Sequence, residues 1–418
     1  MKKVDLIISH ASELATVRGY SDTPCSGPGR MNNLGIITDG AIAVNKGRIV
    51  AVGSDKEIKK NYRSGKTIKA TGNAVTPGLI DPHTHPVFAG DRTLEFEMRI
   101  KGATYQEISA AGGGINSTVR ATRAATKAEL KQNARAHLMK FLSHGTTTIE
   151  AKSGYGLNLN DEVKILEVIK ELGKEKGLPA IVPTFLGAHD VPPEYADNKA
   201  GYVKYLKNKM IPQVSKRKLA EFCDIFCEKG IFEINEARDI LTTARKYGFS
   251  LKLHADEFAA LGGAELAAEL GAVSADHLMA VSDNGISRMR DKGVIGVILP
   301  GTTLALGLKN YAPARKMVDM GLPIALATDF NPGTSMTESM PMIMTIACTM
   351  MKLTPAEALV ASTINAAHAI NRQKQVGSLE EGKDADIVIW NAPSYRHIPY
   401  HWGVNLAKIV IQKGNTVI

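Results

Sequence analysis

Two histidines separated by one residue, His83 and His85, form a pair that could do metal chemistry. They follow the largely apolar run 74–80, which predicts a buried strand. Side chains two residues apart in an extended chain point to the same side, so both imidazoles can reach one point at the strand's C-terminal end. Imidazole is a ligand that zinc and iron prefer. The pair therefore predicts half of a metal site.

Other groups of the same chemical kind follow other short apolar runs. Any one such histidine would more often be structural than functional, but their joint placement favours a metal. Three imidazoles and one carboxylate would leave a coordination position for water, as in a catalytic site, and the metal would lower the pKa of that water to roughly 7. A carboxylate such as Asp329 can ligate the metal and accept the water's proton, and His277 suits a base or electrophile beside it. The residues placed in this way are His83, His85, Glu150, His189, His254, His277 and Asp329.

The elements that must position these residues are strands alternating with helices. Eight such units predict an α/β fold, a (β/α)₈ barrel whose active site lies at the C-terminal ends of the strands. Asn160 or Asp161 is expected to start one helix, and Gly248 to stop another. The predicted strands are 74–81, 146–150, 180–186, 224–228, 249–254, 272–275, 294–299 and 323–328, and the predicted helices are 127–143, 160–175, 235–246, 262–270 and 283–291.

Both ends of the chain show short strand-like runs instead. Residues 1–72 and 370–418 are therefore expected to form one small β-sandwich domain, and residues 73–369 the barrel. The connection 86–127 is too long for an ordinary loop of a compact domain, which favours a lid or binding loop. It contains Arg92 and Tyr105.

Composition is that of a globular chain, with 44% hydrophobic and 22% charged residues in 418. The formal net charge of +9 comes largely from the run 199–218. We interpret this run as a solvated helix face rather than a nucleic-acid site. No stretch is apolar enough to span a membrane, and four scattered cysteines do not make a disulfide framework. A cytoplasmic protein without a nucleic-acid or membrane partner is expected.

The pattern of metal-type residues resembles the metal-dependent amidohydrolase superfamily. The features shared are His-x-His after the first strand, histidines after the fifth and sixth, and aspartate after the eighth. The segment 377–386, Gly-Ser-Leu-Glu-Glu-Gly-Lys-Asp-Ala-Asp, is also typical of it. This resemblance implies that His83, His85, His254 and Asp329 hold one divalent or trivalent ion per chain, zinc or iron. Lys229 follows the fourth strand one residue late for a bridging lysine, which favours one metal over two.

Four longer stretches are similar to the imidazolonepropionase family within that superfamily. They are Pro-His-Thr-His-Pro-Val-Phe-Ala-Gly-Asp-Arg at 82–92, Glu-Ala-Lys-Ser-Gly-Tyr-Gly-Leu at 150–157, Thr-Phe-Leu-Gly-Ala-His at 184–189 and Ala-Thr-Asp-Phe-Asn-Pro-Gly-Thr at 327–334. The resemblance implies hydrolysis of 4-imidazolone-5-propanoate to N-formimidoyl-L-glutamate in histidine degradation, by attack of metal-bound hydroxide on the ring carbonyl. It also suggests a homodimer.

The resemblance assigns roles to further residues. Asp329, Glu257 and His277 are the candidate proton carriers, and Glu257 also contacts the ring. Arg92 suits the propionate because a guanidinium matches a carboxylate's geometry, although an ion pair with Asp91 or Glu95 is the alternative. The other implied substrate contacts are Tyr155, His189, Asn331, Gly333 and Thr334.

Two other functions remain as alternatives. Another cyclic-amide hydrolase or a heterocycle deaminase of the same superfamily would need the same metal site but no clamp of the Arg92 type. A non-catalytic protein on a decayed barrel would be expected to have lost at least one ligand. All the ligand positions are filled, which favours the enzyme.

Overall fold

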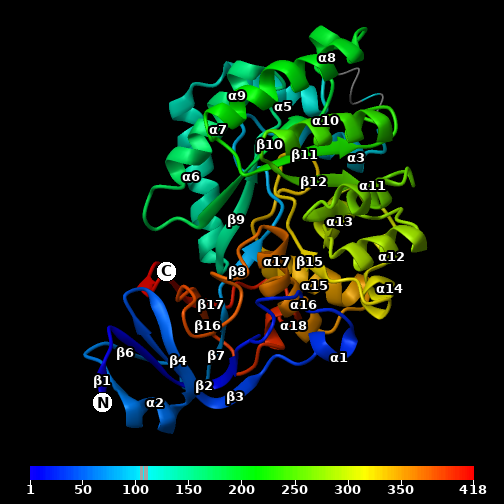
Figure 1. Cartoon of the computed structure of the whole chain (residues 1–418). Coiled ribbons are helices and arrows are strands. Elements are labelled where there is room, and N and C mark those ends of the chain that lie inside the picture. Colours follow the sequence, from blue (N-terminus) through cyan, green and yellow to red (C-terminus); the bar gives the residue numbers. More distant parts are fainter. Residues whose placement is uncertain (104–106, 108–111) are drawn as a thin grey trace.

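The computed structural model describes residues 1–103, 107 and 112–418 (Figure 1). Within these residues, eight parallel strands form a barrel-shaped sheet in the order β15-β14-β13-β12-β11-β10-β9-β8. This confirms the predicted α/β barrel. The strands are β8 (Leu79–Asp81), β9 (Thr146–Lys152), β10 (Ala180–Ala188), β11 (Phe222–Cys227), β12 (Ser250–Ala255), β13 (Ser274–His277), β14 (Ile295–Ile298) and β15 (Ile324–Leu326).

The first and last barrel strands are joined just beyond their C-terminal ends. The amide of His85 donates to the carbonyl oxygen of Phe330 (2.8 Å), and the amide of Asp329 donates to that of His83 (3.1 Å). The hydroxyl of Thr328 also donates to the carboxylate of Asp81 (2.6 Å). These bonds fix the segments that carry His83, His85 and Asp329 relative to one another.

Helices surround the barrel strands (Figure 1). The five predicted helices are all present, as α6 (Lys127–Ser143), α7 (Leu159–Leu172), α10 (Ile234–Lys246), α11 (Gly263–Leu270) and α12 (Asp283–Lys292). The others around the barrel are α8 (Lys199–Tyr205), α9 (Ile211–Lys216), α13 (Pro300–Ala305), α14 (Ala314–Asp319), α15 (Met340–Met351), α16 (Pro355–Ala361) and α17 (Ile364–Ala369).

The predicted start of α7 at Asn160 or Asp161 is wrong. The N-cap is Asn158, whose side-chain oxygen accepts a hydrogen bond from the amide of Asp161 (2.9 Å). Each of these residue types can cap a helix, and the one that does is set by where the preceding loop turns. The predicted stop is close, because α10 ends at Lys246 and Gly248 follows with φ 87°.

The basic run 199–218 lies mainly on α8 and α9. Its Lys199, Lys207 and Arg217 pair with Glu236, Asp239 and Glu167 on neighbouring helices. These pairs compensate part of the positive charge of the run and agree with a solvated helix surface.

Both ends of the chain build a separate sheet (Figure 1). Its strands are β2 (Leu6–Ala15), β3 (Ile36–Asn45), β4 (Arg48–Ser54), β6 (Thr67–Lys69), β7 (Ala74–Pro77), β16 (Ile387–Trp390), β17 (Ala407–Gln412) and β18 (Asn415–Thr416). Two further strands, β1 (Lys2–Lys3) and β5 (Tyr62–Arg63), pair with each other in a separate two-stranded sheet. The expected domain limits, 1–72 with 370–418 against 73–369, stay a prediction.

The run 74–81, predicted as one strand, is two. β7 pairs antiparallel with β16 in the terminal sheet, whereas β8 pairs with β9 in the barrel. Gly78 lies between them, and a Cβ there would overlap the side chain of Thr147. Close backbone approach at a glycine thus lets the chain pass from one sheet to the other, and apolar periodicity does not reveal that change.

The expected loop 86–127 is partly helical. It contains α3 (Thr93–Ile100) and α5 (Ile115–Ala124), while Tyr105 lies outside the described residues. Leu94, Phe96 and Ile100 of α3 are exposed, so this helix shows no apolar stripe facing the core. That explains why the sequence pattern did not predict it.

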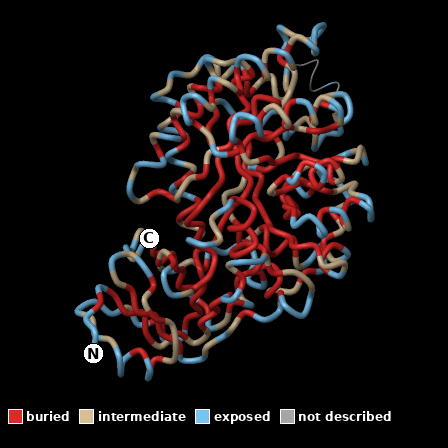
Figure 2. Tube along the Cα trace, viewed as in Figure 1, coloured by how far each residue is buried: buried red, intermediate tan, exposed pale blue. Residues whose placement is uncertain are grey.

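Buried residues are concentrated along the barrel strands (Figure 2). One apolar cluster combines Ile80, Val182, Phe222 and Ile295 from the strands with Ala366 of α17. Polar residues occupy the opposite, C-terminal ends of the strands. Cys25, Cys223, Cys227 and Cys348 are all free, in agreement with the prediction. None of the described helices is long and apolar enough to cross a membrane.

Candidate active site

The four candidate metal ligands converge at the C-terminal ends of β8, β12 and β15. Nε2 of His83 and Nε2 of His85 lie 3.5 and 3.6 Å from Oδ1 of Asp329. The ring centroid of His254 is 4.5 Å from that of His83. At this site, among the described residues, two groups have ligand atoms within 4.8 Å of one another, His83 with His85 and Asp329, and His83 with His254 and His277. The two groups share His83, so one ion near it is within reach of the predicted ligands.

The donor atoms of this cluster fit a cation. Among the described residues, Nε2 of His83, Nδ1 of His85 and both ring nitrogens of His277 are buried without a hydrogen-bond partner. Buried polar atoms rarely lack partners, so an open set of this kind indicates a missing ligand. Burial also lowers the pKa values of His83, His85 and His277 well below the ordinary range. These imidazoles are therefore neutral, the form that binds metal.

Asp329 is held in one orientation. Its Oδ2 accepts a hydrogen bond of 2.5 Å from the hydroxyl of Thr302 on α13. Burial raises its pKa to about 6. Its backbone has φ 53°, in the left-handed region that residues with a side chain seldom adopt, and such strain concentrates at functional sites.

Glu257 and His277 lie together beside the cluster. Oε1 of Glu257 is 3.5 Å from Nδ1 of His277. Burial, with added repulsion from the carboxylates of Asp329 and Glu228, raises the pKa of Glu257 well above its ordinary value. Burial therefore favours the protonated carboxyl of Glu257 and the neutral imidazole of His277, so the pair can give and take protons.

Tyr155 and His189 cover His85. The rings of His189 and His85 stack at 5.2 Å, and that of Tyr155 lies 5.8 Å from His85. His189 is fixed by a contact of 3.0 Å from its Nδ1 to the carbonyl oxygen of Gly154. Burial lowers its pKa to about 3, so it presents a neutral imidazole.

The loop that carries Tyr155 is anchored from below by Glu162 of α7. This buried carboxylate accepts hydrogen bonds from the amides of Gly154, Gly156 and Leu157, at 2.7 to 3.0 Å. Tyr155 therefore belongs to a rigid segment.

Arg92 forms the ion pair with Glu95 that was the alternative to a substrate role, and it also contacts Gly333 in the loop that follows Asp329. Its Nε and Nη2 each lie 2.7 Å from Oε2 of Glu95. Its Nη1 packs so closely on Gly333 that a Cβ there would overlap it. Arg92 is thus fixed in place by Glu95 and lies against the loop that follows Asp329.

Asn331 shapes that loop. Its amide nitrogen donates to the carbonyl oxygen of Asp329 (2.7 Å), and its side-chain oxygen accepts from the amides of Gly333 and Thr334 (2.8 Å each). The hydroxyl of Thr334 also accepts from the amide nitrogen of Asn331 (2.9 Å). In this structure the polar groups of Asn331 are engaged within the loop.

Buried lysine and carboxylate side chains form a network of ion pairs near the candidate ligands, and this network was not predicted from the sequence. Nζ of Lys152 contacts Glu150 (2.9 Å) and Asp224 (2.6 Å), and Nζ of Lys252 lies 3.3 Å from Glu150. None of these side chains is exposed. The available signal was spacing, because Glu150 and Lys152, like Lys252 and His254, are two residues apart on one strand and so share its inner face.

Lys229, the residue considered for bridging two metals, is exposed. The expectation of a single ion stays a prediction.

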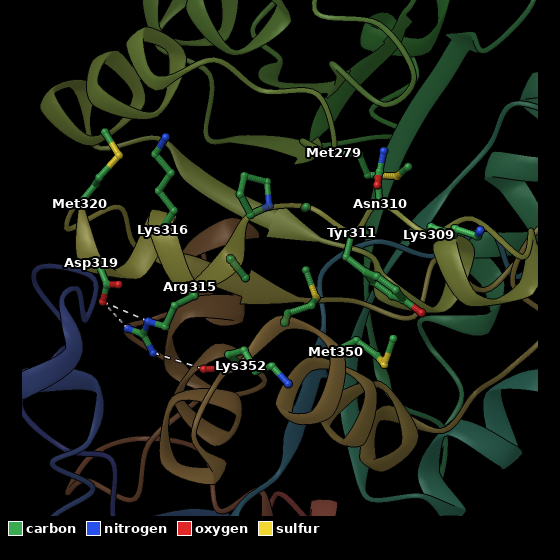
Figure 3. Close-up of a pocket in the computed structure, with 14 residues that line it drawn as sticks. Met279, Lys309, Asn310, Tyr311, Arg315, Lys316, Asp319, Met320, Met350 and Lys352 are labelled. Carbon is green, nitrogen blue, oxygen red and sulfur yellow. Dashed lines mark hydrogen bonds and ion pairs between the residues drawn. The ribbon is translucent and has the colours of Figure 1, made fainter.

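A surface hollow of about 840 Å³ lies elsewhere (Figure 3). It is lined by residues such as Tyr311, Lys316 and Met350, and Arg315 within it is engaged by Asp319 and Glu357. None of the predicted site residues lines it.

Comparisons with known proteins show the family of this chain. Residues 74–418 match the amidohydrolase family. The chain is 51% identical over 417 residues to the imidazolonepropionase of Geobacillus thermodenitrificans (strain NG80-2), covering 99% of this chain and 98% of that protein. It is 48% identical to the imidazolonepropionase of Alkaliphilus metalliredigens (strain QYMF), with coverage of 99% and 98%.

Solved structures share the fold at low sequence identity. A zinc-bound adenosine deaminase from Xanthomonas campestris superposes with a TM-score of 0.73 at 18% identity, covering 99% of this chain and 93% of that one. Molinate hydrolase gives a TM-score of 0.70 at 16% identity, with coverage of 100% and 95%. At this identity the likeness shows the fold alone. The relatives described above are about 50% identical over nearly the whole length. The chain therefore belongs to the amidohydrolase family and, within that family, to the imidazolonepropionases.

Proposed function

We propose that this chain hydrolyses 4-imidazolone-5-propanoate to N-formimidoyl-L-glutamate, a step of histidine degradation. The relatives at 48 to 51% identity support the assignment. The observation that carries it is the loop after Asp329. This loop links a candidate metal ligand to Gly333, on which the guanidinium of Arg92 packs. A hydrolytic centre and a carboxylate-binding cation thus lie side by side.

His83, His85, His254 and Asp329 are the proposed ligands of one zinc or iron ion. The buried Nε2 of His83, which has no hydrogen-bond partner among the described residues and lies 3.5 Å from Asp329, supports this choice. When bound, such an ion lowers the pKa of a coordinated water and polarises a carbonyl group.

The remaining chemistry falls to the chain's own side chains. A water oxygen adds to the ring carbonyl carbon, the carbon–nitrogen bond breaks, and the departing nitrogen takes up a proton. Asp329 is suited to accept the proton of the water, because burial raises its pKa to about 6. Glu257, whose pKa burial raises, and the adjacent His277 are suited to deliver one to the nitrogen.

Arg92, Tyr155 and His189 are the proposed substrate contacts, with Asn331, Gly333 and Thr334 shaping the wall of the site. Arg92 would bind the propionate through its planar donors. The stacked rings of His85 and His189, with Tyr155 beside them, cover the ligands from one side and limit access of bulk water.

We also propose a cytoplasmic homodimer without a nucleic-acid partner. The four free cysteines support a reducing compartment. The ion pairs of Lys199 with Glu236 and of Lys207 with Asp239 support the absence of a nucleic-acid role.

The test is turnover by the metal-loaded chain of 4-imidazolone-5-propanoate in comparison with cytosine, guanine and hydantoin. We expect conversion of the first, with the product identified as N-formimidoyl-L-glutamate. Conversion of one of the others without the first would favour the alternative, a heterocycle deaminase or another cyclic-amide hydrolase.

A further inference from the structure

Asp276 holds the ring of His83 on the side away from Asp329. Oδ2 of Asp276 lies 2.6 Å from Nδ1 of His83, and neither side chain is exposed. The other ring nitrogen, Nε2, lies 3.5 Å from Oδ1 of Asp329 and has no hydrogen-bond partner among the described residues. When Nδ1 donates to a carboxylate, Nε2 carries the lone pair that can bind a metal.

The carboxylate of Asp276 is itself held. The hydroxyl of Ser274, two residues earlier on β13, donates to its Oδ1 at 2.6 Å. This leaves Oδ2 of Asp276 directed at His83, which lies in the segment that follows β8. The contact therefore joins two strands that are far apart in the chain.

Neutralising the two buried lysines is the other task that Asp276 could serve, and the distances disfavour it. Nζ of Lys152 lies 2.6 Å from Asp224 and 3.8 Å from Asp276. Nζ of Lys252 lies 3.3 Å from Glu150 and also 3.8 Å from Asp276. Each ammonium is thus closer to another carboxylate, whereas the nearest partner of Asp276 Oδ2 is His83.

We infer that Asp276 is a positioning residue of the metal site. Its carboxylate selects the tautomer of His83 that directs Nε2 toward the ion, and Ser274 keeps the carboxylate in the orientation that does so. The inference rests on the proposed function only in taking His83 as a ligand. Partners of this kind on metal-binding histidines typically contribute 10- to 100-fold in metal affinity.

The test is the zinc dissociation constant of the full-length chain, stripped of metal and titrated with Zn²⁺ in competition with a chromogenic chelator. Asp276→Asn keeps the size of the side chain and removes the charge, and we expect it to raise the dissociation constant about 10- to 100-fold. Ser274→Ala is a milder change that leaves Asp276 in place, and we expect a rise of a few-fold. The visible absorption of bound Co²⁺ should change in Asp276→Asn because the geometry around the ion changes.

Asp386→Asn is the matched control, because Asp386 is a buried aspartate that belongs to the terminal region and contacts the amide of Lys413. We expect its zinc affinity to equal that of the wild type. The inference is overturned if folded Asp276→Asn binds zinc as tightly as the wild type. If Asp276→Asn does not fold, unchanged affinity in Ser274→Ala overturns it.

Turnover does not enter this measurement, so the two proposals can fail separately. A chain that binds zinc with this dependence on Asp276 but leaves 4-imidazolone-5-propanoate intact would contradict the proposed function and support the role of Asp276.

Discussion

Arg92 occupies the space that a side chain at position 333 would need. Its Nη1 lies against Gly333, four residues after the candidate ligand Asp329, while Glu95 holds the other edge of the guanidinium. The segment 86–127 is therefore anchored to the loop of the last barrel strand through this contact. This contact would couple Arg92, the proposed substrate contact, to Asp329, the proposed metal ligand, through a short piece of backbone.

Gly333→Ala should displace Arg92 and lower kcat/KM about tenfold or more, because one methyl group would overlap Nη1 and force the guanidinium away. Metal content should not change, since Gly333 is not a candidate ligand. Steady-state kinetics and metal analysis check both points. Gly65→Ala is the control, because a Cβ there meets nothing within 4 Å. Equal kinetics in the two variants would contradict the coupling.

Arg92→Ala should lower kcat/KM about 100-fold or more, through loss of a charge-assisted contact with the propionate and the loss of a buried partner for Glu95. Arg92→Lys should also be impaired, because an ammonium keeps the charge without the planar pair of donors. Kinetics and metal content should be measured together. Normal turnover at normal metal content would remove Arg92 from the site.

The buried carboxyl group of Asp386 should make the free energy of unfolding depend on pH. Burial raises the pKa of this carboxyl from its ordinary value of 3.8 to about 7. Between these values the folded state binds a proton that the unfolded state has lost, so the free energy of unfolding should fall as pH rises from 4 to 7. The full effect of such a shift is at most about 4 kcal/mol.

Asp386→Asn removes this titration while its side-chain oxygen can still accept from the amide of Lys413. The variant should gain stability relative to the wild type as pH rises through that window, measured by urea unfolding at several pH values. Parallel stability curves for the two proteins would show that Asp386 does not titrate in this range.

Removal of the metal should lower stability as well as activity. The ligand cluster leaves buried imidazole nitrogens without partners, and an ion that binds only the folded state stabilises it by about 2.7 kcal/mol at 100 times its dissociation constant. Adding Zn²⁺ to the stripped chain should therefore raise the melting temperature. Asp329→Ala should lose most of that rise, and an equal rise in both proteins would place the ion elsewhere.

The sequence predicted the barrel strands and five of the helices around them because these elements show clear local patterns. The helix 127–143 has the predicted limits, since its apolar spacing and its N-cap Thr126 agree. The prediction of one strand at 74–81 was wrong because two strands of different sheets follow one another without a polar break. The prediction of the N-cap of α7 was wrong because Asn158, Asn160 and Asp161 are all chemically able to cap a helix.

The metal-type residues could be predicted for a different reason. A parallel barrel brings all strand ends to one face, so position along the chain decided which histidines meet. Contacts across the barrel could not be predicted in the same way. The pairing of Asp276 with His83 and of Lys152 with Asp224 depends on the register of strands distant in sequence. The packing of Arg92 on Gly333 depends on the path of a long connection.

Turnover of 4-imidazolone-5-propanoate measured as metal is added back to the stripped chain tests the central claim most directly. We predict that formation of N-formimidoyl-L-glutamate rises in proportion to bound zinc or iron and levels off at about one ion per chain, the number expected of an open mononuclear site. Full turnover by the metal-free chain, or none at full loading, would contradict the account.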